Sequence, residues 1–154
     1  MGTTTTGRRP LQFATLAEVM PDVDRLLQGH RTVGRWSLAQ ICNHLAQTLI
    51  YSIEGFPDRA PWLLRRTFGA FAKRHVLATG VIREGGKLPE RYLPRPGLDD
   101  RAEAEALRGA LHLYSAHPGP LADHPLFGPL DRAEWTRIHC VHSAHHLSFA
   151  HPLT

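Results

Sequence analysis

The sequence predicts an all-α protein, a four-helix bundle with an additional covering helix and Pro-rich loops. Apolar residues recur at helical spacing, capping motifs mark four helix starts, and no alternating run is long enough to demand a sheet. The chain of 154 residues is long enough for one domain that buries its own core. We therefore expect a disordered tail over residues 1–10 and a single helical domain over residues 11–154.

The helix starts are predicted from pairs of residues three positions apart. In a capping box, a Ser, Thr or Asp side chain and a Glu or Gln three residues later accept hydrogen bonds from free backbone N–H groups of the first turn. The four pairs are Thr15 with Glu18, Ser37 with Gln40, Asp100 with Glu103, and Asp131 with Glu134. They predict four main helices.

A further helix is expected over residues 61–79, with Pro61 near its start and Gly80 as its stop. Its larger residues share one face, which predicts a cover over the bundle. These residues are Leu64, Phe68, Phe71, His75 and Ala78. The Pro- and Gly-rich segments 84–97 and 117–130 are predicted to be irregular connectors.

Composition narrows the classes of function. Two cysteines, 42% hydrophobic and 21% charged residues are typical of a globular protein from a reducing compartment, so we expect a cytoplasmic protein. The arginine pairs are scattered and lack an aromatic RNA-binding pattern or a zinc-finger spacing, which argues against nucleic acid as a partner. No apolar segment predicts a signal peptide or a membrane span, and we expect no membrane partner.

The last predicted helix carries the most informative pattern, a cluster of histidines on its apolar face. His142 and His146 are four residues apart, so on a helix both imidazoles project from one side and can reach one metal ion. On a helical wheel the large residues Trp135, Ile138 and Phe149 fall within about 60° of His142. The histidines should therefore face the core or an internal cavity.

A third ligand is expected from the second main helix. His44 lies in the middle of that helix, beside an apolar arc that includes Ile41 and Leu45. A single histidine in this position is more often a core-edge residue than a ligand, and a pair four apart can also be hydrogen-bonded or solvated. The spacing of the histidines is compatible with two interpretations: a metal site, or histidines that hydrogen-bond one another in a polar core.

Several longer strings resemble one known family. They are Trp36-Ser-Leu-Ala-Gln-Ile-Cys-Asn-His44-Leu-Ala-Gln, Tyr51-Ser-Ile-Glu-Gly-Phe-Pro57, His124-Pro-Leu-Phe-Gly-Pro-Leu130, and Glu134-Trp135 leading to His142-Ser-Ala-His-His146-Leu. Together they resemble the DUF1569 family of the DinB/YfiT-like metalloenzyme superfamily, from about Arg9 to Pro152.

The resemblance implies a four-helix bundle that holds a divalent metal between its second and last helices. Carried over residue by residue, the ligands are His44, His142 and His146. Superfamily members with an assigned activity are mostly S-transferases or isomerases that use low-molecular-weight thiols such as mycothiol or bacillithiol. No activity of the DUF1569 branch itself carries over, and a shared fold does not transfer chemistry.

Three histidine ligands would leave a coordination position open, as in catalytic sites. A thiol or a water bound there loses its proton readily, so we expect a small-molecule substrate and either S-transferase-like or hydrolase chemistry. Zinc is the default metal, with nickel, iron and manganese as the other candidates. Residues close enough on the wheels to act beside the ligands are His139, His145, Tyr51, Gln47 and Glu54.

The connectors and the covering helix are expected to roof the open side of the metal. Apolar walls are predicted from Phe68, Phe71, Tyr92 and Phe127, and a cation for an anionic substrate from Arg91 or Arg95. The competing hypothesis is a non-catalytic helical module, in monomeric or homodimeric form, in which the metal only ties two helices together.

Overall fold

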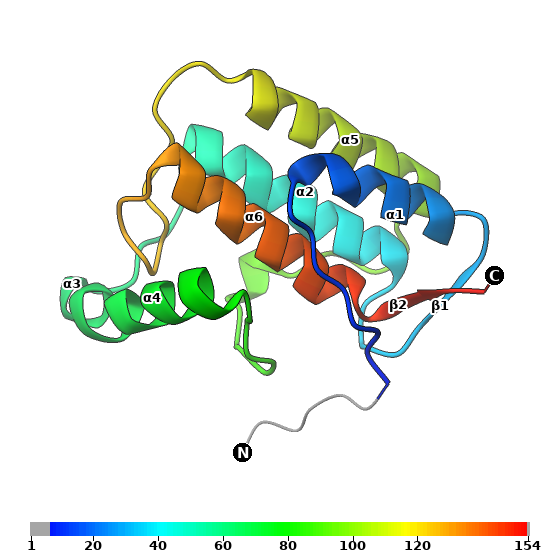
Figure 1. Ribbon diagram of the computed structural model, residues 1–154, viewed down its shortest axis with the longest axis horizontal. Helices are drawn as coiled ribbons and strands as arrows, with labels where there is room; N and C mark the ends of the chain where they lie inside the picture. Colours follow the sequence, from blue (N-terminus) through cyan, green and yellow to red (C-terminus); the bar gives the residue numbers. More distant parts are fainter. Residues whose placement is uncertain (1–6, 154) are drawn as a thin grey trace.

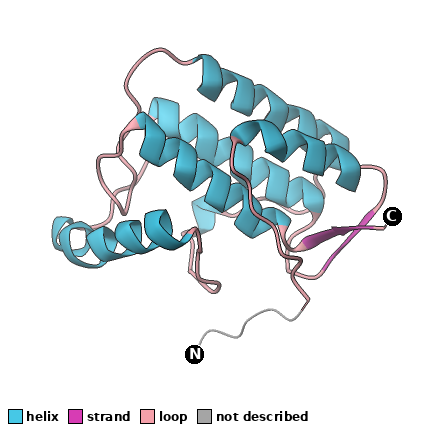
Figure 2. Ribbon diagram, viewed as in Figure 1, coloured by secondary structure: helices cyan, strands magenta, loops and turns pink. Residues whose placement is uncertain are grey.

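The computed structural model describes residues 7–153 and is mostly helical, with a small two-stranded sheet (Figures 1 and 2). A short 3-10 turn, η1 (Leu16–Glu18), leads into α1 (Val19–Leu26). The longer helices are α2 (Leu38–Glu54), α5 (Asp100–Ala116) and α6 (Arg132–Leu147). Helix α2 packs against α5 and α6, and α1 packs against the same two helices, so the core lies among these four.

The predicted covering helix is present but divided. It consists of α3 (Trp62–Leu64), one wide π turn η2 (Arg65–Gly69), and α4 (Ala70–Thr79), which ends at Gly80 in the left-handed conformation. Helix α4 packs against α6, while α3 reaches beyond the other helices at the lower left of Figure 1. The connector that follows contains the 3-10 turn η3 (Glu90–Tyr92).

The sheet is an addition that the sequence does not predict. Strand β1 (His30–Thr32) pairs antiparallel with β2 (Ala150–Pro152). A strand of three residues is too short to show an alternating pattern, and its partner lies near the other end of the chain. The ladder fixes the segment after α6 to the segment between α1 and α2.

Three of the four predicted capping boxes are confirmed, at Thr15, Ser37 and Asp131. The fourth prediction was wrong by one residue. The N-cap of α5 is Asp99, whose side chain accepts from the backbone N–H of Ala102 at 2.8 Å. The carboxylate of Asp100 instead accepts from the backbone N–H of Ala39 at 2.8 Å. This contact joins the first turn of α5 to the first turn of α2, so a tertiary partner replaced the local one.

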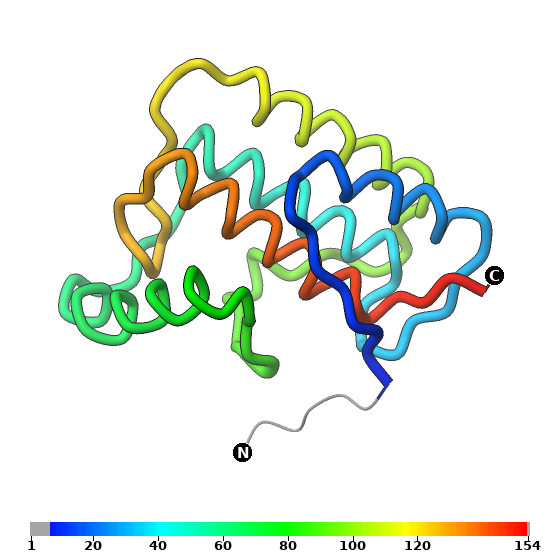
Figure 3. The backbone as a smooth tube through the Cα atoms, viewed as in Figure 1, coloured from blue at the N-terminus to red at the C-terminus, as the bar shows by residue number. Residues whose placement is uncertain are grey.

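The predicted tail spans residues 1–10, of which residues 1–6 lie outside the described residues. Its last part packs against the protein. The backbone N–H of Arg9 donates to the carbonyl of Ser148 at 3.0 Å, and the Arg9 guanidinium pairs with Asp22 at 2.6 Å. Figure 3 shows the segment that precedes α1 running across the end of α6. None of the helices within residues 7–153 is long and apolar enough to cross a bilayer.

Candidate metal centre

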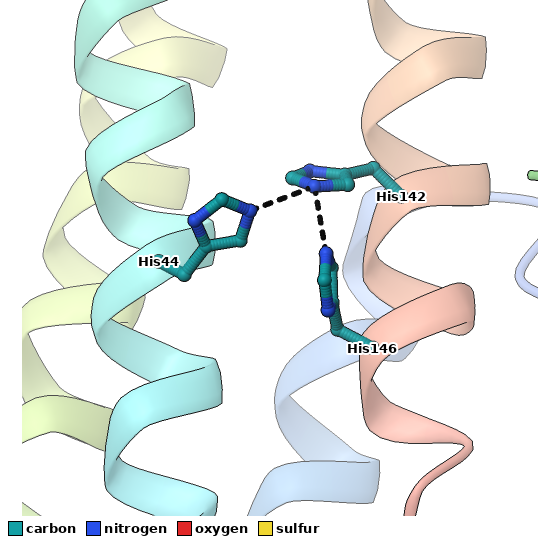
Figure 4. Close-up of side chains that lie close together, drawn as sticks. All are labelled: His44, His142 and His146. Atoms are coloured by element: carbon teal, nitrogen blue, oxygen red, sulfur yellow. Dashed lines mark hydrogen bonds between the residues drawn. The ribbon is translucent and has the colours of Figure 1, made fainter. Parts of the chain in front are cut away.

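Three imidazole nitrogens converge between α2 and α6 (Figure 4). The Nε2 atom of His142 lies 3.1 Å from Nε2 of His44 and 3.0 Å from Nε2 of His146. Each of the three residues offers one nitrogen, and these nitrogens all lie within 4.8 Å of one another. The two histidines on α6 are one turn apart, and the packing of α2 against α6 brings His44 opposite them.

Burial keeps these imidazoles neutral. Loss of solvent lowers the pKa of His44 to about 4. Burial also lowers the pKa of His142 and of His146 well below the ordinary value, and neighbouring histidines add to both shifts. A neutral imidazole has a lone pair on one ring nitrogen, which is the form that binds a metal.

The contacts at His142 are poorly satisfied by hydrogen bonds alone. A ring nitrogen carries either one proton or one lone pair in the ring plane, so Nε2 of His142 has a single site for two neighbours. A cation between the three nitrogens would satisfy all of them at once. Two ligands at about 2.0–2.2 Å from one ion lie roughly 2.9–3.5 Å apart, and the observed distances fall in that interval. The donor set therefore fits a divalent metal.

Other parts of the chain orient two of the rings. The backbone of Tyr92, in η3, hydrogen-bonds His44 and works against the lowering of its pKa. The Trp36 ring is stacked on His146, with centroids 5.1 Å apart and an interplanar angle of 16°. The same indole lies 5.0 Å from the His44 ring. Such contacts restrict rotation of the two imidazole rings.

An arginine lies on the side of the site where the N-terminal segment crosses α6. The Arg8 guanidinium pairs with Glu84 at 2.7 Å and lies 3.3 Å from Nδ1 of His145. Its third nitrogen donates to the Ser148 hydroxyl at 2.9 Å. The His145 ring meets the edge of the His146 ring at 4.9 Å. A charged pair thus lies beside a residue that contacts a candidate ligand.

Comparison with known families assigns nearly the whole chain to one of them. Residues 5–153 match the model described as "Protein of unknown function (DUF1569)". The chain belongs to the DUF1569 family. No curated protein and no solved structure matches the chain, so the comparisons extend to the family alone.

In this DUF1569 protein, His139 lies away from the three converging nitrogens. Its Nε2 is 3.1 Å from the Ser52 hydroxyl, and its ring is stacked on Trp135 and meets the edge of Tyr114. Burial lowers the pKa of His139 to about 3. The residue is held in the core between α2, α5 and α6. His145, by contrast, lies beside both the site and Arg8.

The three candidates on α2 have different surroundings. Tyr51 contacts the rings of Phe56 and Tyr92, so it lies next to the connector that reaches His44. Gln47 is exposed and lines a shallow groove of about 320 Å³ between α2 and α5. Glu54, the last residue of α2, is exposed. Of these three, Tyr51 is the one with a contact toward the loop at the site.

The predicted roof needs correction in this DUF1569 chain. Phe68 and Phe71 were expected as walls of the site, but their side chains are 57% and 68% exposed. Phe127 is stacked on His124 at 4.2 Å. Arg91 pairs with Asp58 at 3.2 Å. The connector after α4 does approach the site, through Glu84 and Tyr92.

Two residues that lie beside the histidine cluster were not predicted from the sequence. Trp36 precedes the Ser37 cap, and a pattern of helix starts says nothing about which rings an indole covers. Arg8 lies in the segment predicted as a tail. Its basic neighbour Arg9 and the Pro10 that follows gave no sign that the segment packs. Only the tertiary fold shows both contacts.

Proposed function

We propose that this DUF1569 protein binds one divalent metal ion through His44, His142 and His146 and is a metal-dependent enzyme that acts on a small molecule. The observation that carries the proposal is the convergence of three neutral imidazoles. The Nε2 atoms of His44 and His146 both lie next to Nε2 of His142. Under this proposal α1, α2, α5 and α6 form a DinB/YfiT-like four-helix bundle with the site between α2 and α6.

Zinc is the metal that we propose first, with nickel, iron and manganese as alternatives. A bound ion of this kind would lower the pKa of a thiol or water in its open position. This supports S-transferase-like chemistry with a low-molecular-weight thiol, or hydrolysis. The chain's own part is to hold the three rings and to keep them neutral.

The surroundings of the site support access by a small molecule. The His44 side chain is 7% exposed, whereas those of His142 and His146 are partly exposed. A substrate would then approach from the side of α6. Arg8 is the arginine beside this side, and its guanidinium would attract an anionic group such as a carboxylate.

A non-catalytic role is the second candidate, and one observation favours it. His44 and His146 come from different helices, and the Trp36 ring lies on both of them. A metal here would tie α2 to α6 and stabilise the fold even without chemistry. The two candidates differ in whether the metal keeps a position that an added ligand can enter.

Cobalt(II) substitution separates them. The absorption spectrum of protein-bound cobalt depends on the ligands, and a bound thiolate adds a sulfur-to-cobalt charge-transfer band. We expect this band when a small thiol is added to the cobalt-loaded protein, and its loss in His142→Ala but not in His75→Ala, a variant on α4. A cobalt spectrum that does not change when thiols or other small ligands are added would contradict the enzyme proposal and support the non-catalytic role.

A further inference from the structure

An exposed apolar surface lies on the segment that joins α2 to α5. We call residues 62–79, which comprise α3, η2 and α4, the arm. Of the ten large apolar side chains that are exposed in residues 7–153, five lie within the first ten residues of the arm. They are Trp62, Leu63, Leu64, Phe68 and Phe71, with exposed fractions between 43% and 68%.

The arm turns this surface outward because its opposite side is anchored. Val76 is 7% exposed and belongs to the main core. Gly69 packs so closely on the second connector that a Cβ atom there would collide with the backbone oxygen of Leu126. Helices of globular proteins normally bury their largest apolar residues, and an exposed group of large apolar side chains marks an interaction surface.

The charge of the surrounding segment indicates the kind of partner that this apolar surface binds. Residues 59–83 contain six Arg or Lys and no Asp or Glu. This local charge exceeds the net charge of +4 of the whole chain, so the rest of the chain is net negative. The net positive charge of the sequence therefore falls in this segment, in which Arg59 is paired with Asp123 at 4.0 Å.

The arginines nearest the apolar residues are available to a partner. Arg66 lies over the Trp62 ring at 5.1 Å and is exposed. Arg74 is exposed and makes no ion pair within residues 7–153. Lys73, in contrast, is held by Glu134 at 3.0 Å. Exposed cations at the border of an aromatic and aliphatic face are the pattern of helices that lie in the headgroup region of anionic membranes.

We propose that the arm docks on the surface of a membrane rich in anionic phospholipids, with Phe68 and Phe71 inserted among the headgroups. This replaces the expectation that the protein has no membrane partner, which rested on the lack of a spanning segment. A second copy of the chain is disfavoured as the occupant because two arms face to face would bring like charges together. The proposal is independent of the metal site.

Vesicle co-sedimentation of the full chain tests the proposal. We expect binding to vesicles of mixed phosphatidylcholine and phosphatidylglycerol, little binding to phosphatidylcholine alone, and weaker binding as salt is raised. Trp62 is 62% exposed while Trp135 is fully buried and Trp36 is partly buried. The fluorescence of Trp62 should therefore shift to the blue on the anionic vesicles.

Matched variants make the test specific. Phe68→Ser with Phe71→Ser should lower the partition coefficient at least about tenfold, whereas Leu113→Ser, a 55% exposed residue on α5, should leave it unchanged. Arg66→Gln and Arg74→Gln should each lower it about fivefold. Equal binding to neutral and anionic vesicles, or unchanged binding of the double Phe variant, would overturn the proposal. So would a dimer in sedimentation analysis that the double Phe variant dissociates, because the arm would then be an interface between copies.

Discussion

The Nε2 atoms of His142 and His44 lie 3.1 Å apart although the residues are separated by 98 positions in the chain. In the unfolded chain these nitrogens are not held together. An ion that they share would bind the folded state in preference to the unfolded one. Metal binding and folding would therefore be coupled at this point.

Removal of metal should lower the thermal stability. A ligand present at about 100 times its Kd contributes about 2.7 kcal/mol, which for a chain of this length is roughly 5–10 °C in Tm. We expect a chelator to lower the Tm of the metal-loaded wild type by an amount in this range. Differential scanning calorimetry with and without chelator measures the change.

The chelator effect should depend on the histidines of the site. His142→Ala should lose most of it, while His75→Ala on α4 should keep it. If the wild type and His142→Ala respond to the chelator by the same amount, the metal is bound elsewhere.

The Arg8 and Glu84 pair should tune metal affinity in opposite directions. Glu84 compensates the positive charge of Arg8, which lies next to His145. Glu84→Gln leaves that charge unbalanced, so we expect metal binding to weaken severalfold, whereas Arg8→Gln should strengthen it. Competition with a fluorescent chelator measures both constants. Weaker metal binding in both variants would mean that the ion pair acts by holding the connector after α4 against the N-terminal segment, and not by its charge.

Trp36 should hold the ligand rings in place. Its indole is stacked on His146 and lies against His44. We expect Trp36→Ala to weaken metal binding by about tenfold, the lower end of the effect of contacts that orient ligands, and Trp36→Phe to retain most of the affinity. Isothermal titration gives the values. A Trp36→Ala variant with wild-type affinity would show that the rings need no such support.

Acid should destabilise the protein through His124, which lies away from the candidate metal site. Burial lowers the pKa of His124 to about 4, and its Nδ1 accepts from the backbone N–H groups of Leu126 and Phe127 at 3.1 and 3.0 Å. The unfolded chain takes up the proton near pH 6.5 but the folded chain only near pH 4. This contribution is therefore complete above about pH 6.5 and is lost as pH falls toward 4.

A substitution isolates this effect. In His124→Asn the side-chain oxygen can still accept from the two backbone N–H groups, but the residue does not titrate. Urea unfolding at pH 7 and pH 5 should show a smaller loss of stability in His124→Asn than in the wild type. An identical loss in both proteins would place the acid sensitivity elsewhere.

The grouping of the three candidate histidines could be predicted in part from the sequence because it depends on short-range geometry. The spacing of His142 and His146 follows from the pitch of a helix, and His44 was indicated by the resemblance to DUF1569 and by its place beside an apolar arc. The residues that contact or flank these histidines were not predictable in this way. Trp36 and Arg8 reach the site through the crossing of distant segments, which no local pattern encodes.

The same distinction between local and tertiary contacts applies to the fold. The helix starts at Ser37 and Asp131 were predicted correctly because a capping box is local. Asp100 was misassigned because its carboxylate found a tertiary partner at Ala39. The arm shows the opposite failure. Its apolar periodicity was real, but periodicity alone does not tell whether the apolar face meets a core or an external partner.

The most direct measurement is the metal content of protein purified without an affinity tag, dialysed against limiting metal, and analysed by mass spectrometry of the elements. We predict close to one divalent ion per chain in the wild type and in His75→Ala, and almost none in His44→Ala, His142→Ala or His146→Ala. Wild-type protein that retains no metal, or variants of the three histidines that retain as much as the wild type, would contradict the assignment of this site.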